Sequence, residues 1–142
     1  MQKRIIHPIS DFELEPDRTQ LSVFTAAAAI TEGDAVFVNS SGRVDRARAD
    51  ASSTMHAVGV AYEAIASAGR GRIVTHGPMR SDNYDGSGRL GLFAWVSPTT
   101  AGGVTGVPPS SSGQIRQQVG VWRERRLLYV SLGGASQVGG VL

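Results

Sequence analysis

Short apolar runs that end in clusters of turn-forming residues are the feature that most limits what this chain can fold into. Ala35–Val38 ends at the polar stretch Asn39–Gly42, and Arg43–Val44 restarts at once, as in a hairpin. The 142 residues include 18 glycines together with many serines, threonines and alanines. Small residues between short β-branched runs predict strands joined by tight turns, not packed helices.

The same pattern recurs along the chain and predicts a mainly β protein. We expect a single small antiparallel β-barrel or β-sandwich. Asp45–His56 is polar and rich in alanine, so a loop or a short helix fits it. His76–Met79 is expected to be a turn at a strand end, because Pro78 cannot continue a ladder. The expected strands are Leu21–Thr25, Ala35–Val38, Arg43–Val44, Ala57–Ile65, Arg72–Gly77, Leu90–Val96, Val104–Thr105, Gln117–Trp122 and Arg126–Leu132.

The two ends of the chain differ from the part between them. Residues 1–20 combine prolines and charges with scattered apolar side chains, and they show no helical or alternating period. We interpret this segment as an extended arm that lies on another protein surface, or as a partly ordered terminus. The expected β-domain spans 21–132, and 133–142 forms a glycine-rich tail. The candidate anchors of the arm are Ile5, Ile6, Ile9, Phe12 and Leu14.

The two halves of the expected β-domain echo one another imperfectly. Phe37–Val44 leads through a variable interval to Val58–Ala61, and Trp95–Thr105 leads likewise to Val119–Trp122. Each half places an aromatic residue and a valine before a small-residue turn, and later a Val-Gly-Val strand. A glycine between two strand valines often marks a bend or a close backbone approach. Two such units can pair into one barrel or sandwich, although small residues also produce such echoes by chance.

Composition and charge disfavour several functional classes. With 14 basic and 12 acidic residues the net charge is +2, which is too balanced for a protein that acts mainly through phosphate contacts. The longest apolar stretch, Val23–Ile30, is far shorter than the ~20 residues that span a bilayer. Met1–Pro8 lacks the apolar core of a secretory signal. We therefore expect a soluble protein made in the cytoplasm, without nucleic-acid or membrane partners.

No group of residues with catalytic or metal-binding spacing stands out. Cysteine is absent, and His7, His56 and His76 are far apart in sequence. Asp82–Gly88 begins like a calcium loop, but the closing glutamate is missing, so a polar turn is favoured. We expect no enzymatic activity, no cofactor and no metal. A small β-barrel hydrolase stays as a disfavoured alternative, because sequence does not reveal side chains that converge in space.

Two clusters of arginines are candidate interface charges. Acidic residues interrupt both clusters, and no stacking-aromatic pattern accompanies them, which disfavours nucleic acid as the partner. Arginine is also favoured at protein interfaces, because its planar fork pairs with carboxylates and stacks on rings. Ion pairs with the acidic residues of the N-terminal segment on a neighbouring subunit are our hypothesis. The clusters are Arg43, Arg46 and Arg48, and Arg123, Arg125 and Arg126.

Turn-and-strand patterns in both halves resemble those of small β-barrel proteins of tailed bacteriophages. Such proteins decorate the head as capsid cement, and related barrels occur in head fibres and tail-tip modules. The resemblance covers approximately Gly33–Leu132. The residues that carry it are Val58–Gly77, Trp95–Thr105, Pro108–Pro109, Gly113 and Val119–Val121.

The resemblance implies a structural role with no catalytic residues. It implies binding to the major capsid protein on the outer surface of the virion, as homotrimers or dimers, with an extended arm across adjacent subunits. Under this interpretation residues 1–20 are that arm, and the protein stabilises joints between capsid proteins. The alternative is a head-fibre or tail-tip module that recognises host glycan, with Tyr84 and the 82–88 loop as the exposed candidates.

Overall fold

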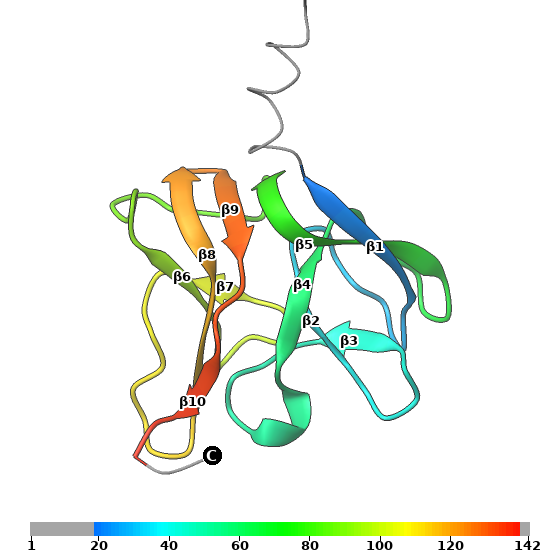
Figure 1. The fold of residues 1–142 in the computed structure, drawn as a ribbon, viewed down its shortest axis with the longest axis horizontal. Coiled ribbons are helices and arrows are strands. Elements are labelled where there is room, and N and C mark those ends of the chain that lie inside the picture. Colours follow the sequence, from blue (N-terminus) through cyan, green and yellow to red (C-terminus); the bar gives the residue numbers. More distant parts are fainter. Residues whose placement is uncertain (1–18, 140–142) are drawn as a thin grey trace, which may run out of the picture.

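Ten strands and one 3₁₀ turn make up the part of the chain that the computed structural model describes, residues 19–139 (Figure 1). Within that range no helix is long and apolar enough to cross a membrane. The arm anchors expected from the sequence, Ile5, Ile6, Ile9, Phe12 and Leu14, lie outside the described residues. The elements are β1 (Gln20–Thr25), β2 (Ala35–Val38), β3 (Val44–Arg46), η2 (Ser52–Thr54), β4 (Ala57–Ala61), β5 (Arg70–Arg80), β6 (Phe93–Val96), β7 (Val104–Thr105), β8 (Ile115–Glu124), β9 (Leu127–Ser131) and β10 (Ala135–Gln137).

The strands form one curled sheet in the order β3-β2-β4-β5-β9-β8-β6-β7, with β1 added to β5 and β10 added to β8. Every pairing between these strands is antiparallel. The expectation of a small, mainly β protein with barrel-like or sandwich-like curvature is therefore confirmed. Figure 1 shows the two halves of the sheet side by side, with the long strand β5 between them and β1 at one flank.

Backbone hydrogen bonds tie the two ends of the curled sheet together. Residues that follow β3 provide these bonds: the Ala49 N–H donates to the Ser97 carbonyl at 2.9 Å, and the Ile115 N–H donates to the Ala49 carbonyl at 2.8 Å. The Gly102 N–H donates to the Ala47 carbonyl at 2.7 Å. Ala47 and Ala49 are completely buried, because only a small side chain fits where the two ends of the sheet meet.

Two clusters of buried side chains stabilise the sheet. Strand residues alternate between its faces, so alternate positions enter the core. The larger cluster lies inside the curl, and the smaller one is formed by β2, β3, β4 and β5 together with the segments that follow β1 and β4. Full burial of one such large apolar side chain stabilises the fold by about 1.5–3 kcal/mol. The larger cluster is centred on Trp122, Leu128, Val130, Val74, Val60 and Val96, and the smaller one on Ile30, Val36, Val44, Ile65 and Ile73.

The sequence echo corresponds to a repeated pattern of strand pairing. The order β3-β2-β4-β5 of the first half is matched by β7-β6-β8-β9 in the second half, and the two halves meet where β5 pairs with β9. In each half the glycine of the Val-Gly-Val strand lies opposite the residue before the aromatic residue: Gly59 opposite Val36, and Gly120 opposite Ala94. A register irregularity follows at once in both pairs. The halves differ in burial, since Phe37 is buried whereas Trp95 is half-buried.

The two equivalent glycines are required by close backbone approach. A Cβ atom added to Gly59 would overlap the carbonyl oxygen of Val74 on β5. A Cβ atom added to Gly120 would overlap the carbonyl oxygen of Tyr129 on β9. Backbone atoms cannot move aside as a flexible side chain does, so both positions exclude any side chain. The close approach expected from the Val-Gly-Val pattern is confirmed.

The expectation of a turn at His76–Met79 is wrong, because β5 continues through Pro78 to Arg80. Pro78 lies opposite Tyr129 of β9. Its carbonyl accepts a hydrogen bond from the Thr19 hydroxyl at 2.8 Å. Thr19 precedes β1, so this side of Pro78 faces no strand of the ladder. A strand residue directs its N–H and C=O to the same side, so the missing N–H of Pro78 interrupts no ladder.

Two further segments refine the expected boundaries. Within the polar interval Asp45–His56, the first two residues complete β3, and Ser52–Thr54 form the single turn η2. Within the expected tail, 133–142, residues Ala135–Gln137 form β10 and pair with Ile115–Gln117 of β8. The sheet therefore extends past Leu132. This strand has no local signature, because Ala-Ser-Gln carries no apolar alternation.

Candidate protein-binding surface

Four neighbouring strands present a row of uncharged side chains on the face of the sheet that points away from the core. Phe93 on β6 lies opposite Val121 on β8, Val121 lies opposite Tyr129 on β9, and Tyr129 lies opposite Pro78 on β5. Directly opposed residues of antiparallel strands point to the same face. Phe93 is 49% exposed, and the other three are half-buried. We call these four residues the outer row.

Aromatic and cationic side chains flank the outer row. Trp95 contacts Phe93 edge-on, with the ring centroids 6.0 Å apart. His76 contacts Tyr129 edge-on at 5.4 Å, and its Nε2 lies 3.3 Å from the Tyr129 hydroxyl. The Arg123 guanidinium lies 4.1 Å above the Tyr129 ring centroid. Tyrosine, tryptophan, phenylalanine and arginine are the residue types that protein interfaces favour over the remaining surface.

Two exposed leucines lie in the turn that precedes β6. Leu90 is 58% exposed and Leu92 is 53% exposed. Their backbone is held in place, because the Gly91 N–H donates to the Trp122 carbonyl at 2.8 Å and the Trp122 N–H donates to the Leu92 carbonyl at 3.0 Å. Trp122 itself is buried in the core. The leucines are thus fixed in an exposed position by the core and do not belong to a free loop.

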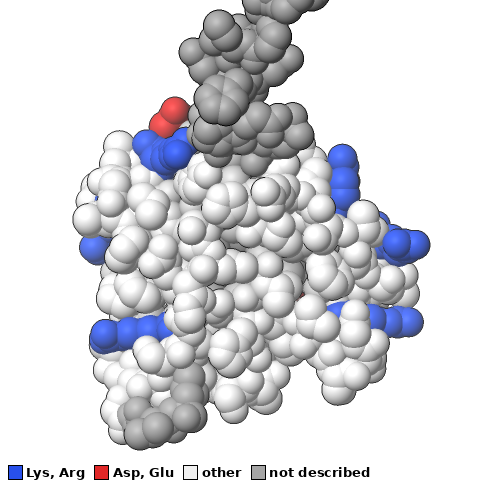
Figure 2. All heavy atoms as spheres, in the orientation of Figure 1, with Lys and Arg blue, Asp and Glu red and all other residues white. Residues whose placement is uncertain are grey.

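The charged side chains are distributed unevenly over the surface. In the view of Figure 2, arginine side chains stand at the rim, and the broad centre over β4, β5 and β9 shows no charged side chain. Depletion of charge at the centre, with arginine at the edge, is the usual distribution at protein–protein interfaces. Residues 19–139 contain eleven arginines and eight carboxylates, so this part of the chain carries a positive excess.

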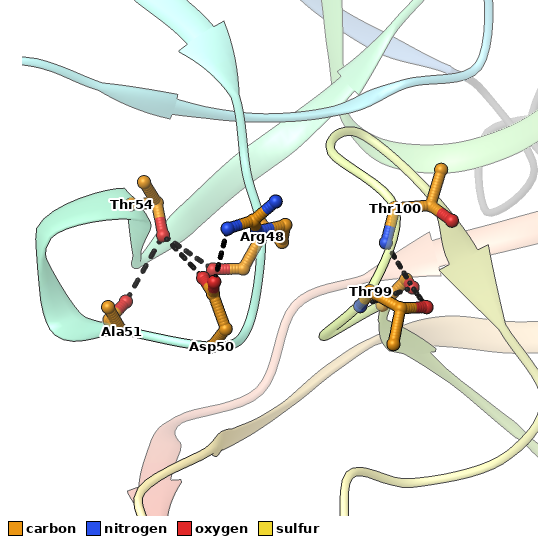
Figure 3. A network of polar contacts seen from close by, with 7 residues as sticks. Arg48, Asp50, Ala51, Thr54, Thr99 and Thr100 are labelled. Carbon is orange, nitrogen blue, oxygen red and sulfur yellow. Dashed lines mark hydrogen bonds and ion pairs between the residues drawn. The ribbon is translucent and has the colours of Figure 1, made fainter.

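The first predicted arginine cluster lies on and beyond β3. Arg43, Arg46 and Arg48 are all exposed, and Arg46 and Arg48 alternate with buried alanines. The Arg48 guanidinium forms an ion pair with Asp50 at 2.5 Å (Figure 3). The hydrogen bond from Arg48 lowers the pKa of the Asp50 carboxyl. One of the three arginines is therefore already paired within its own chain.

Figure 3 shows why this segment keeps its shape. The Thr54 hydroxyl, at the end of η2, donates to the Arg48 carbonyl at 2.6 Å and closes the turn. On the neighbouring segment, Ser97 Oγ accepts hydrogen bonds from the Thr99 N–H at 3.2 Å and from the Thr100 N–H at 3.1 Å. These local bonds fix the two loops that meet where the sheet closes.

The second predicted cluster is divided between different roles. Arg126 is half-buried, and its Nη1 donates to the carbonyls of Asp82 at 2.6 Å and Tyr84 at 2.7 Å. It therefore holds the 82–88 loop. Arg125 lies 3.6 Å from Asp85 in an exposed ion pair, and Arg123 stacks on Tyr129 as described above. Figure 1 places the β8–β9 hairpin far from β3, so the fold does not bring the two clusters together.

The expectation that Tyr84 is exposed is wrong. Tyr84 is only 3% exposed, and its hydroxyl donates to the Gly33 carbonyl at 3.0 Å. Its ring contacts Trp122 edge-on at 5.7 Å, and burial raises the pKa of its phenol. The loop composition conceals this role, because its other residues are those of a solvated turn. Tyr84 anchors the loop and offers no ring for stacking a sugar.

Metal-binding side chains do not gather in the part of the chain that the structure covers: no three His, Cys, Asp or Glu residues between 19 and 139 are placed to hold an ion together. No protein-family model matches this sequence, and a search of curated proteins finds no match either. The outer row is therefore the feature from which a function is argued. Strand alternation places Phe93 and Trp95 on one face, whereas their alignment with β8, β9 and β5 depends on the strand order.

Proposed function

We propose that this protein is a structural binding module whose outer row contacts another protein, and that it acts as a capsid cement protein on the head of a tailed bacteriophage. The observation that supports binding to protein is the composition of the outer row and its flanks: the rings of Phe93, Trp95 and Tyr129 and a stacked arginine along a row of uncharged side chains. The resemblance of both halves to phage decoration proteins supports the shell as the partner.

A rigid sheet face is suited to this role. Side chains held on paired strands lose little conformational freedom when they bind, which lowers the entropic cost of association. A cement protein stabilises a shell by adding contacts across joints between capsid proteins, so that more contacts must break before the shell ruptures. A standard interface of about 1,600 Å² forms a stable contact, and repetition over many copies multiplies its effect on the shell.

The N-terminal segment has a role in this proposal that follows from charge. Residues 11–17 contain four carboxylates, Asp11, Glu13, Glu15 and Asp17, whereas the body of the protein has an excess of arginine. We propose that this segment pairs with exposed arginines, such as Arg43 and Arg46, on an adjacent subunit. Exposed ion pairs are screened by salt, so the contribution of the segment should fall as ionic strength rises.

The decisive experiment mixes the purified protein with cognate empty heads. Binding at fixed stoichiometry and a raised rupture temperature are expected. Phe93→Ser removes the most exposed member of the outer row and should weaken head binding at least tenfold. The matched control is Val107→Ser, since Val107 is an apolar residue of similar exposure, 55%, in the loop after β7. Equal binding by both variants would exclude the outer row as the contact.

The same experiment separates the alternatives. No binding of the unmodified protein to heads would refute the cement function. A glycan-array signal that survives Phe93→Ser would instead support a receptor-binding module. Deletion of residues 1–18 tests the arm by itself: tight binding that is unchanged by the deletion would remove the arm from the proposal while leaving the outer row in place.

A further inference from the structure

Within residues 19–139, β1 is an edge strand that pairs on one side only. Its residues pair with Arg70–His76 of β5 on one side. Among the described residues, none of the backbone hydrogen bonds outside the strand ladders begins or ends within Gln20–Thr25. Two of its side chains are well exposed, Leu21 at 41% and Val23 at 53%. Figure 1 shows β1 running across β5 at one flank of the sheet, and β5 is the one described strand with which β1 pairs. An open edge of this kind is a template for another strand.

The other ends and branches of the sheet carry the features that normally prevent strand addition. β3 has three residues and carries Asp45 and Arg46, and its continuation is bonded to the opposite end of the sheet. β7 has two residues and is followed closely by Pro108 and Pro109. β10 has three residues, Ala-Ser-Gln. Shortness, charge and proline are the usual protections of an edge.

β1 has none of these protections along most of its length. It is six residues long and contains neither a charged residue nor a proline. Its single irregularity lies at its first step, between Gln20 and Leu21, so the remaining residues follow a regular extended path. An edge that is long, regular, uncharged and partly apolar is unusual in a protein that protects its other edges. We propose that the outer edge of β1 pairs with the outer edge of β1 in a second copy of this chain.

The absence of charge on β1 favours a second copy as the occupant. In a two-fold contact each strand faces its own sequence in the opposite direction. A charged residue near the two-fold axis would then lie opposite the same residue of the other copy, and the two like charges would repel. Gln-Leu-Ser-Val-Phe-Thr is free of this repulsion. A two-fold axis through Ser22 places Leu21 of each copy opposite Val23 of the other, and both exposed apolar side chains become covered.

This contact is expected to be weak in solution. One added strand pair covers much less than the roughly 1,200 Å² that stable interfaces bury. We therefore expect a monomer–dimer equilibrium with a dissociation constant on the order of 10 µM or weaker. The inference concerns self-association alone and does not rest on shell binding. A failure of the protein to bind heads would leave it unaffected.

The first test uses the absence of native cysteine, which makes introduced thiols specific reporters. Leu21→Cys and Val23→Cys variants are mixed and oxidised with diamide. Opposed residues of an antiparallel pair have Cα atoms about 4.5–5.5 Å apart, within the range for a disulfide. The mixture should therefore form covalent dimer at least tenfold faster than Ser136→Cys, which places an exposed thiol on β10. It should also react faster than either variant alone, which fixes the register.

The second test breaks the contact without a thiol. Val23→Lys places a charge on the edge, and lysine is the residue that natural edge strands use to prevent pairing. The side chain is already 53% exposed, so the fold should survive, and a thermal melt checks this. Sedimentation velocity over rising concentrations should show dimerisation weakened at least tenfold. If Val23→Lys leaves sedimentation unchanged, or the cysteine mixture reacts no faster than Ser136→Cys, the self-pairing is refuted. In that case, loss of head binding in Val23→Lys would assign the edge to the shell instead.

Discussion

Replacement of Gln117 by leucine should lower the free energy of unfolding sharply, because this buried side chain links two strands that do not pair. Gln117 is only 3% exposed. Its Oε1 accepts from the Ala57 N–H at 2.7 Å, and its Nε2 donates to the carbonyls of Ala57 at 3.0 Å and Gly133 at 3.1 Å. The side chain thus takes the place of a strand between β8 and the start of β4. Leucine has a similar volume but leaves three backbone groups without this partner.

The magnitude follows from the number of groups left unpaired. A buried polar group without a partner costs about 1–3 kcal/mol, whereas burial of the added apolar surface returns about 1 kcal/mol. Three groups at the lower limit of this range cost about 3 kcal/mol, so we expect Gln117→Leu to lower the free energy of unfolding by about 2 kcal/mol or more, a large part of the 5–15 kcal/mol typical of a domain. In urea the midpoint should fall by about 1–2 M with an unchanged slope.

The neighbouring residue provides the matched control. Gln118 is half-buried, and its Nε2 reaches the Ser131 carbonyl only at 3.5 Å. Gln118→Leu should change the free energy of unfolding by less than about 1 kcal/mol. A change of less than about 1 kcal/mol in Gln117→Leu, or an equal effect of the two substitutions, would refute the reasoning that Gln117 replaces missing strand pairing. A changed slope would show that the two-state comparison does not apply.

Three further substitutions test separate parts of the structure. Gly120→Ala should destabilise the fold by about 3 kcal/mol or more in urea, because its Cβ would overlap a backbone carbonyl, whereas Gly134→Ala, with open space around it, should stay within about 0.5 kcal/mol. Tyr84→Phe leaves a buried carbonyl without its donor and should cost about 1–2 kcal/mol in the same assay. Glu63→Gln should lower the thermal midpoint slightly at pH 7. Hydrogen bonds from Arg72 lower the pKa of Glu63 to about 2. The stabilisation of the fold by ionised Glu63 is therefore complete above the unfolded-state pKa. It decreases as the pH falls below about 4.5 and disappears below about pH 2. A difference that persists at the lowest pH would contradict this assignment.

Local patterns in the sequence predicted most of the strands. Ala35–Val38 and Val104–Thr105 have the expected bounds, because turn residues bracket both runs and the alternation of strand faces is a local property. The Val-Gly-Val segments were also informative, since a glycine in the middle of a strand adds no side-chain packing and marks a place where another backbone comes close. Both kinds of signal are contained within a few consecutive residues.

Features that depend on distant parts of the chain escaped prediction. Gln117 bonds to Ala57, sixty residues earlier, and its sequence neighbourhood resembles any polar strand position. Tyr84 lies in a segment with the composition of a solvated turn, and its contacts with Gly33 and with Trp122 on β8 explain its burial. The outer row likewise exists because β6, β8, β9 and β5 are adjacent. Local sequence specifies which residues alternate, but not which strands lie side by side.

The two proposed contacts use different directions of the sheet and are compatible with one another. Edge pairing through β1 extends the sheet within its own plane, whereas the outer row projects from the face of β5, β9, β8 and β6. A dimer therefore presents two outer rows at once, and linkage of two sites strengthens binding to a repeated surface by about 10²–10⁴ when the geometry allows both to engage. Phe93→Ser should then weaken head binding in monomer and dimer alike. Val23→Lys should reduce only the part of the head-binding strength that comes from linking two copies. Its binding should therefore equal that of the unmodified protein at concentrations too low for dimers to form on the shell.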